Sequence, residues 1–262
     1  MSDWLGLAGK TVAVTGALGG LGRAITRAFL EADCQVLLID RPPADETAAM
    51  AEFAGLKVRF AAADVSDRAS LETAFALGRE AFGAVDLLVN NAAMSNPAPL
   101  KALEPAAFER QMQVNVGGYL LCAQVYLAQR PEGAGSIVNI ASIAGRNAQL
   151  NSGGYATGKA AILMLSQQMA LEWGPEGVRV NSVSPGLFVT PLTKHFYEDP
   201  ADRKRREDVV PLRRVGDPKD LADAVVYLSS ARAAYVNGAE IIVDGGFSQT
   251  LMSHIPRPYH KG

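Results

Sequence analysis

The stretch TVAVTGALGGLGRAITRAFLEA (residues 11–32) decides the fold. An apolar run leads into a glycine-rich turn, and a segment with apolar residues at helical spacing follows. Glycine lets a backbone approach a ligand closely, and the free N–H groups at a helix start attract an anion. This order predicts a pyrophosphate site, and the alternative is simply a tight strand-to-helix turn. The residues expected there are Gly16, Leu18, Gly19, Gly20, Leu21 and Gly22.

The alternation of apolar runs and helical patterns continues along the chain. The runs are rich in Val, Ile and Leu and almost unbroken, which is typical of strands buried on both faces of a parallel sheet. We therefore expect one α/β domain over residues 1–262, a Rossmann-type doubly wound parallel sheet of about seven strands with helices on both faces. The expected strands are 11–16, 35–40, 57–64, 85–91, 136–142, 178–186 and 239–246, and the expected helices are 20–32, 67–82, 108–130, 155–173 and 220–230.

Two segments interrupt this alternation. Residues 187–217 form a long connection, and long insertions often act as lids, so we expect a substrate lid there. Residues 251–262 carry two prolines, which are incompatible with an ordinary helix. We expect an extended C-terminal arm that packs on a neighbouring subunit, and the alternative is a frayed terminus.

The composition excludes several classes of function. The chain has 262 residues and a net charge of −2, which argues against a broad surface for nucleic acid. Its two cysteines and three histidines show no disulfide or metal-ligand spacing, so we expect no metal. The sequence shows neither a signal peptide nor an apolar run long enough to span a membrane. These features predict a cytoplasmic protein without nucleic-acid or membrane partners.

The stretch YATGK places Tyr155 and Lys159 four residues apart at the start of an expected helix, on one face. A phenol is a poor base at neutral pH, but a nearby cation favours the phenolate and lowers its pKa. The pair therefore indicates an acid/base device. Taken alone, such a pair is far more often part of a solvated helix face, so the rest of the chain must decide.

Asp40 ends the second expected strand, about twenty residues after the glycine-rich turn. A carboxylate there can accept hydrogen bonds from ribose hydroxyls and repels a 2′-phosphate, which favours NAD over NADP. The neighbouring Arg41 is a candidate partner for such a phosphate and complicates this interpretation. The alternative for Asp40 is a helix or turn cap.

With these motifs, the sequence resembles the classical short-chain dehydrogenase/reductase family over about residues 8–250. TGALGGLG is similar to its cofactor loop, and residues 90–93 (NNAA) are similar to its N-N-A-G motif with Ala93 in place of glycine. The resemblance implies a catalytic set of Asn115, Ser142, Tyr155 and Lys159. It further implies cofactor contacts at Asp40, Arg41, Asp64, Val65, Asn91, Tyr155, Lys159, Pro185, Phe188 and Thr190.

Each of these residues also has a purely structural alternative. Ser142 can cap a strand end, Asn115 can be a buried amide bonded to backbone, and Asn91 can be a turn residue. Thr190 can be the N-cap of a helix that starts at Pro191. The joint occurrence of all the motifs in order favours the family.

The resemblance implies a mechanism as well. Tyr155 would act as general base or acid, with its pKa lowered by Lys159, which would also bind the nicotinamide ribose. Ser142 would hold the substrate oxygen, and Asn115 would hold a water that links Lys159 to solvent. The family further implies a homotetramer in which the 108–130 and 155–173 helices pair between subunits.

The substrate is indicated only by polar residues near the expected site. We expect it to contact Asn96, Ser142, Arg146, Gln149 and Tyr155. A site built to bond hydroxyls favours a sugar, an acidic sugar or a polyol, including oxidation of an aldose to its lactone. The alternative is that these residues face solvent. The basic residues within 203–214 are either a solvated helix face or a handle for an anionic substrate.

Two other functions compete with a sugar or polyol dehydrogenase. One is a reductase of 3-oxoacyl chains on a carrier, or of another ketone, for which the basic residues within 203–214 would dock the carrier. The other is a non-catalytic protein that senses NAD. Such a protein would be expected to lose Tyr155 or Lys159, and both are present.

Overall fold

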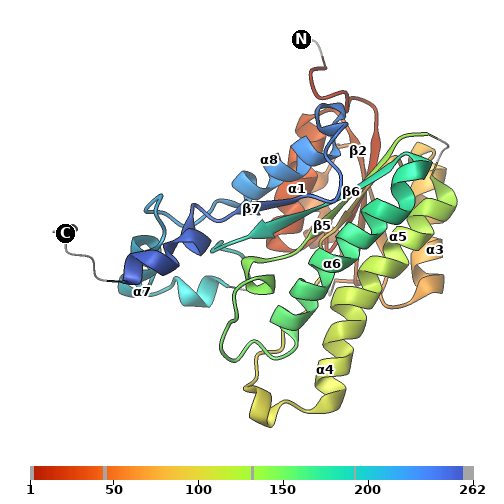
Figure 1. The fold of residues 1–262 in the computed structure, drawn as a ribbon. Helices are drawn as coiled ribbons and strands as arrows, with labels where there is room; N and C mark the ends of the chain where they lie inside the picture. Colours follow the sequence, from red (N-terminus) through yellow and green to blue (C-terminus); the bar gives the residue numbers. More distant parts are fainter. Residues whose placement is uncertain (1–2, 44–45, 131–132, 192, 256–262) are drawn as a thin grey trace.

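The computed structural model describes residues 3–43, 46–130, 133–191 and 193–255. Within these residues, seven parallel strands form one sheet in the order β3-β2-β1-β4-β5-β6-β7, with helices on both faces (Figure 1). This confirms the predicted single doubly wound α/β domain. The strands are β1 (Thr11–Thr15), β2 (Gln35–Asp40), β3 (Val58–Ala62), β4 (Leu87–Asn90), β5 (Gly135–Ile140), β6 (Val178–Pro185) and β7 (Glu240–Val243).

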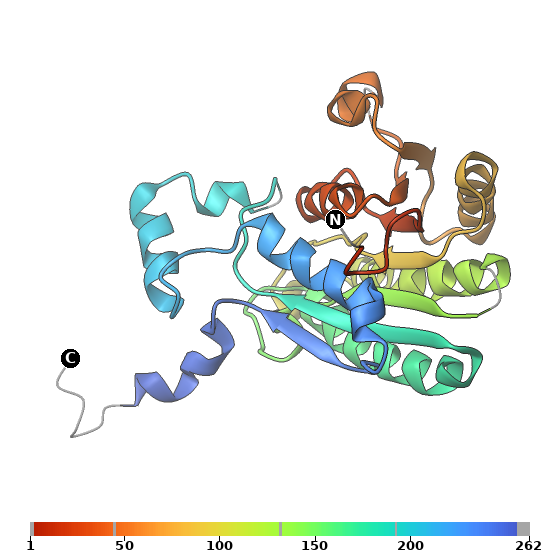
Figure 2. The ribbon, with the colours of Figure 1, turned by 90° about the horizontal axis from the view of Figure 1, so that it is seen from above.

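The two layers of helices follow from the alternation of side chains along each strand. On β1, Val12 and Val14 point into a core with α1 and α8, whereas Ala13 points into a second core with α3, α5 and α6. The view in Figure 2 shows these layers on either side of the sheet. The helices of these two layers are α1 (Gly20–Glu31), α3 (Arg68–Phe82), α5 (Gly118–Gln129), α6 (Tyr155–Trp173) and α8 (Pro218–Ser229).

Several elements differ from the prediction. The expected helix 108–130 consists of α4 (Pro105–Met112), a π-helical turn (Gln113–Gly117) and α5. Two short helices were not predicted. One is α2 (Glu46–Met50), which buries no side chain. The other is α7 (Pro200–Val209), which lies inside the expected lid and is polar on all sides, so it has no apolar periodicity to reveal it.

The predicted extended arm is wrong for its first residues. Phe247–His254 form a 3-10 helix that follows β7 and projects from the domain (Figure 1). The two prolines lie beyond this helix, so they do not prevent it from forming. Residues 256–262 of the expected arm lie outside the described part of the chain.

The strand order locates the site. The chain moves outward from β1 through β2 to β3, then returns to the other side of β1 at β4 and moves outward through β5, β6 and β7. The connections that leave β1 and β4 therefore diverge, and the carboxyl ends of these strands border a crevice. The glycine-rich turn after β1 lies at this point.

Phe75 of α3 is completely buried against the sheet. We expect Phe75→Ala to lower the free energy of unfolding by about 3–5 kcal/mol, because it loses apolar burial and leaves a cavity. Urea unfolding measures this loss, with Leu56→Ala at a half-exposed position as the control. Equal stability losses in the two variants would contradict the assigned core.

Candidate active site

The glycine-rich turn contains positions at which the structure leaves no room for a side chain. Gly16 has a φ of +62°, and a Cβ there would lie 2.8 Å from Ala92 Cα. A Cβ at Gly22 would lie 2.1 Å from the Gly16 carbonyl oxygen. Helix α1 begins at Gly20, and its N-cap Gly19 makes no side-chain cap, so the first N–H groups of the helix, which include that of Leu21, have no intrahelical partner. The turn thus presents backbone donors at close range.

The turn is tied to the end of β4. Asn91 Nδ2 donates to the carbonyl oxygens of Thr15 (3.1 Å) and Gly16 (2.9 Å). Thr15 Oγ1 accepts in return from the backbone N–H groups of Asn91 (3.0 Å) and Ala92 (3.1 Å). Asn91 is therefore a structural tie between the two strands that border the crevice.

Asp40 lies at the end of β2 beside the same turn. Its Oδ2 accepts from Leu18 N (2.9 Å) and its Oδ1 from Arg41 N (2.8 Å). These bonds fix a half-buried carboxylate at the edge of the glycine-rich turn. The Arg41 residue is exposed.

Asp64 and Val65 follow β3. Asp64 accepts hydrogen bonds from Ser66 N (2.8 Å), Ser66 Oγ (2.6 Å) and Arg110 (3.1 Å). The bond with the Ser66 side chain is the largest cause that lowers the pKa of Asp64, so the carboxylate stays ionised. Val65 is buried and packs against Gly118, where a Cβ would lie 2.8 Å from its Cγ2.

Ser142, Tyr155 and Lys159 come together where β5 ends and α6 begins. Ser142 is buried, and its Oγ accepts from Ala144 N (3.1 Å). Tyr155 is the first residue of α6 and hydrogen-bonds with Ser142. Lys159 is almost fully buried, and its Nζ lies 5.7 Å from the centre of the Tyr155 ring. The structure thus places the Tyr–Lys pair of YATGK close to the serine that the family resemblance implies.

Burial dominates the electrostatics of this group. It raises the pKa of Tyr155, and the hydrogen bond with Ser142 acts in the opposite direction. It lowers the pKa of Lys159 to about 7. Burial and the Ser142 hydrogen bond are thus the causes that act on the Tyr155 pKa in this arrangement, and the effect of Lys159 on it stays a prediction. The Lys159 ammonium donates instead to the Ile140 carbonyl (2.6 Å) and to Tyr119 Oη (3.3 Å).

Asn115 lies in the π-helical turn and is fully buried. Its Oδ1 accepts from Met94 N (2.8 Å), and its Nδ2 donates to Met94 O (2.9 Å). The side chain is thus bonded to backbone and holds the loop after β4. Gln111, also buried, donates to Asn96 O (2.9 Å) in the same loop.

Sequence reasoning did not single out Tyr119 or Gln111. Both are polar residues four positions from Asn115 along the chain. This spacing on a helix was the available signal.

The segment after β6 approaches the glycine-rich turn. A Cβ at Gly20 would lie 2.6 Å from Pro191 Cδ and 2.9 Å from Thr190 Cβ. Thr190 is not a helix N-cap: its N–H donates to Thr193 Oγ1 (3.0 Å), which itself donates to Phe188 O (2.7 Å). The Phe188 side chain is buried in the core cluster that also contains residues of α8. Pro185 is buried at the end of β6.

Not all of the residues expected to contact the substrate are available to do so. Asn96 and Gln149 are exposed on the loops that follow β4 and β5. These loops are joined by a β-bridge between Ala98 and Ser152. Arg146 forms an ion pair with Glu240 of β7, whose other oxygen accepts from Ser184 Oγ (2.5 Å). The Arg146 guanidinium is therefore engaged by β7, and the structure does not bring it to Ser142 and Tyr155.

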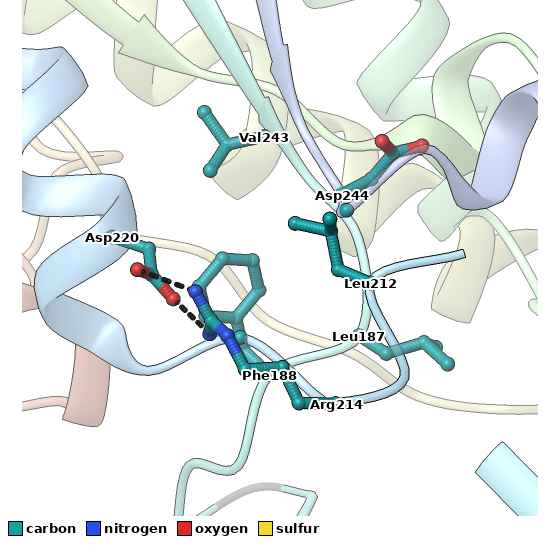
Figure 3. Close-up of a pocket in the computed structure, with 9 residues that line it drawn as sticks. Leu187, Phe188, Leu212, Arg214, Asp220, Val243 and Asp244 are labelled. Atoms are coloured by element: carbon teal, nitrogen blue, oxygen red, sulfur yellow. Dashed lines mark hydrogen bonds and ion pairs between the residues drawn. The ribbon is translucent and has the colours of Figure 1, made fainter. Parts of the chain in front are cut away.

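A cavity of about 170 Å³ separates the end of the expected lid from the sheet. Leu187, Phe188, Leu212 and Val243 line it, and Figure 3 shows the paired Arg214 and Asp220 side chains beside Phe188. The Arg214–Asp220 pair has N–O distances of 2.6 and 3.0 Å.

The basic residues within 203–214 have partners of their own. Arg203, Lys204 and Arg205 form ion pairs with acidic residues of the same helix. Arg206 stacks on Phe196 and Tyr197 at 4.6 and 5.2 Å from the ring centres. This pairing favours the solvated-face interpretation over an anion handle.

Two further properties concern the described residues as a whole. No group of three His, Cys, Asp or Glu residues among them is placed to hold a metal ion. No helix among them is long and apolar enough to cross a membrane.

Comparison with known proteins agrees with this geometry. A family model described as enoyl-(acyl carrier protein) reductase matches residues 16–248. The chain is 36% identical to 2-(R)-hydroxypropyl-CoM dehydrogenase of Xanthobacter autotrophicus, over 91% of this chain and 98% of that protein. It is 35% identical to galactitol 2-dehydrogenase (L-tagatose-forming) of Cereibacter sphaeroides, over 92% of this chain and 96% of that protein.

A solved structure is also similar. It is that of a gluconate 5-dehydrogenase from Burkholderia cenocepacia in complex with NADP and tartrate. It matches with a TM-score of 0.86 and 31% identity, over 94% of this chain and 98% of that chain. The chain therefore belongs to the short-chain dehydrogenase/reductase family, whose members bind a nicotinamide cofactor. It is an oxidoreductase that acts on alcohol groups.

The buried Lys159 predicts a pH-dependent stability. Its pKa falls from 10.5 to about 7 on folding, so between these values the unfolded chain binds more protons and stability rises with pH. Below pH 7 the buried ammonium is destabilising. We expect Lys159→Met to be more stable than wild type there by about 1–3 kcal/mol, since lost hydrogen bonds offset part of the gain.

Urea unfolding of both proteins, from just below pH 7 to near pH 10.5, measures this difference. The advantage of the variant should shrink as the pH rises, because the wild-type lysine loses its charge in the folded state. A constant difference across the range would contradict the assigned environment of Lys159.

Proposed function

We propose that the protein is an NAD-dependent dehydrogenase of a sugar, an acidic sugar or a polyol. The observation that carries this proposal is the convergence of Ser142, Tyr155 and Lys159 where β5 ends and α6 begins. A phenol, a hydroxyl and an ammonium this close together would bind a substrate oxygen and move its proton. NAD, the substrate class and the individual residue roles are the proposed parts.

The residues present fit a dinucleotide. The turn at Gly16, Gly20 and Gly22 has no room for a Cβ, so its backbone is bare, and the first N–H groups of α1 lack intrahelical partners. Asp40 is held where it would accept from the adenine ribose, which supports NAD. Asp64 and Val65 would border the adenine, and Thr190 with the Phe188 backbone would border the nicotinamide. The chemistry that a bound NAD would supply is that of a hydride acceptor for the alcohol carbon.

Side chains of the protein itself would accept and return the proton of the substrate. The Ser142 hydroxyl would bond the substrate oxygen and orient it towards Tyr155. The Tyr155 phenolate would accept the alcohol proton as general base, and the phenol would return it when a ketone is reduced. Lys159, at 5.7 Å from the Tyr155 ring centre, would favour the phenolate electrostatically and bind the nicotinamide ribose. Asn115 would fix the cleft wall through Met94 and hold the water of the proton relay.

The substrate class is supported by polar residues on the loops that follow β4 and β5. Asn96 and Gln149 are exposed on two loops that Gly153 N and Ala98 O join at 3.1 Å. Relatives named for galactitol and gluconate act on hydroxylated or acidic small molecules, according to their names. Since the basic residues of α7 are already paired, a polyol or sugar hydroxyl is the preferred ligand over a strongly anionic one.

Three other proposals concern the lid, the oligomeric state and the location of the protein. Residues 187–217 would act as a lid, because they lie beside both the glycine-rich turn and the cavity of Figure 3. A homotetramer would cover Met164 and Leu171, which are 64% and 79% exposed on α6. A cytoplasmic location is proposed with them.

A panel assay tests the proposed function. NAD reduction is followed with polyols, aldoses, sugar acids and simple secondary alcohols, and the same set is repeated with NADP. We expect NAD to be reduced with one hydroxylated class and little activity with simple alcohols. Activity with 3-oxoacyl thioesters alone would support the carrier-linked reductase instead, and tight NADH binding without any turnover would support the non-catalytic alternative.

Tyr155→Phe removes the acid/base group and keeps the ring. We expect kcat to fall by about 10²- to 10⁴-fold, which is the usual contribution of a positioned acid or base. The NADH dissociation constant, measured by fluorescence, should stay near the wild-type value. Tyr227→Phe on the surface of α8 is the control. Turnover close to wild type in Tyr155→Phe would refute the assigned role.

Asp40→Asn tests the choice of cofactor. The amide keeps an acceptor for Leu18 N but removes the charge that would repel a 2′-phosphate. We expect the ratio of NADP to NAD affinity to rise about tenfold or more, corresponding to about 1.4 kcal/mol. Titration of the two dinucleotides measures the ratio, with Arg41→Ser as the companion variant. An unchanged ratio in Asp40→Asn would show that this carboxylate does not select NAD.

A further inference from the structure

Lys159 has a second tyrosine as its neighbour. Tyr119 of α5 is almost fully buried, and its ring centre lies 5.3 Å from Lys159 Nζ, on a different helix from Tyr155. The ammonium is therefore near two aromatic rings, one from its own helix and one from α5. Cations interact favourably with such rings, and more strongly when they are desolvated.

The hydrogen bonds around Tyr119 have a fixed direction. Its hydroxyl donates to the Ile140 carbonyl (3.0 Å), so its oxygen lone pairs are left to accept from Lys159 Nζ (3.3 Å). The same carbonyl accepts from Lys159 Nζ at 2.6 Å. Burial raises the pKa of Tyr119 well above its ordinary value, so the hydroxyl keeps its proton while Lys159 titrates.

From this geometry we propose that Tyr119 is a positioning residue for Lys159, whose hydroxyl holds the amine beside the end of β5 and favours its charged form. The inference rests on the proposed function for the task of Lys159, which is to act on Tyr155. Tyr119 itself touches neither substrate nor cofactor in this scheme. Burial is the cause that disfavours the Lys159 ammonium, and the Tyr119 hydroxyl opposes this effect.

Few other groups around Lys159 could favour its charged form. Tyr155 faces Lys159 from α6, and Tyr119 faces it from α5, with Cys122 beside Tyr119. Burial raises the pKa of Cys122 as well, so the thiol stays neutral. In the part of the chain that the structure describes, no carboxylate contributes to the shift of the Lys159 pKa. From β5, Ile140 offers the carbonyl that accepts from Lys159 Nζ.

Tyr126 provides a matched control on the same helix. It is fully buried, and its hydroxyl donates to the backbone carbonyl of Asp86 at 2.5 Å. Tyr119→Phe and Tyr126→Phe thus each remove one buried hydroxyl that donates to a backbone carbonyl. Each is expected to lower stability by a similar amount, and thermal unfolding checks that both variants fold. Only Tyr119→Phe removes an acceptor from Lys159.

The test is an NMR titration of protein labelled with ¹³C at the lysine Cε atoms, without added dinucleotide. The Lys159 signal is identified by its loss in Lys159→Met. We expect Tyr119→Phe to lower the Lys159 pKa by about one unit, or about tenfold less ammonium at a fixed pH above the midpoint. Tyr126→Phe should leave it unchanged. Superimposable titrations of Tyr119→Phe and wild type would overturn the proposal, as would equal shifts in both variants.

A second readout uses the active enzyme. With less ammonium beside Tyr155, the ascending limb of the pH profile of kcat/KM for alcohol oxidation should move to higher pH in Tyr119→Phe and not in Tyr126→Phe. A purely structural role would lower activity at every pH without moving the limb. The titration requires no turnover, so a failed substrate panel would refute the proposed function and leave the test of Tyr119 intact.

Discussion

The joint between β1 and β4 is the constraint on which the rest of the molecule depends. Thr15 and Asn91 bind each other's backbone at the carboxyl ends of these two strands, where the direction of winding reverses. This joint fixes the glycine-rich turn on one side and the loop from Met94 on the other. Asn115 then holds that loop from the π-helical turn. The walls of the crevice at this point are thus held by the strand order and by six hydrogen bonds of Thr15, Asn91 and Asn115.

The chemistry of the site follows from burial. Ser142 and Tyr155 meet where β5 ends and α6 begins, and Lys159 extends from the next turn of α6 into the protein. Burial disfavours the charged forms of both the phenol and the amine, raising one pKa and lowering the other. The two values therefore move apart, which favours the neutral phenol and increases the share of neutral amine. Polar neighbours such as Tyr119 and the Ile140 carbonyl then determine how much ammonium remains.

The sequence predicted the strands and the main helices, because buried parallel strands and amphipathic helices leave clear periodic patterns. It also brought Tyr155, Lys159 and Ser142 together through motif order. It did not predict α7, which is charged on all sides, or the 3-10 helix at Phe247–His254. The ion pair of Arg146 with Glu240 and the contact of Tyr119 with Lys159 link residues far apart in the chain. Such pairs depend on tertiary packing, which local sequence patterns do not reveal.

The central claim is that this cleft passes a hydride directly between an alcohol carbon and the nicotinamide. Its most direct test uses a polyol or sugar that carries deuterium on the reacting carbon, incubated with the protein and NAD. The account predicts that the isolated NADH carries the deuterium on its nicotinamide ring, and that Tyr155→Phe yields almost none. NADH without deuterium, or label transfer that does not depend on Tyr155, would contradict it.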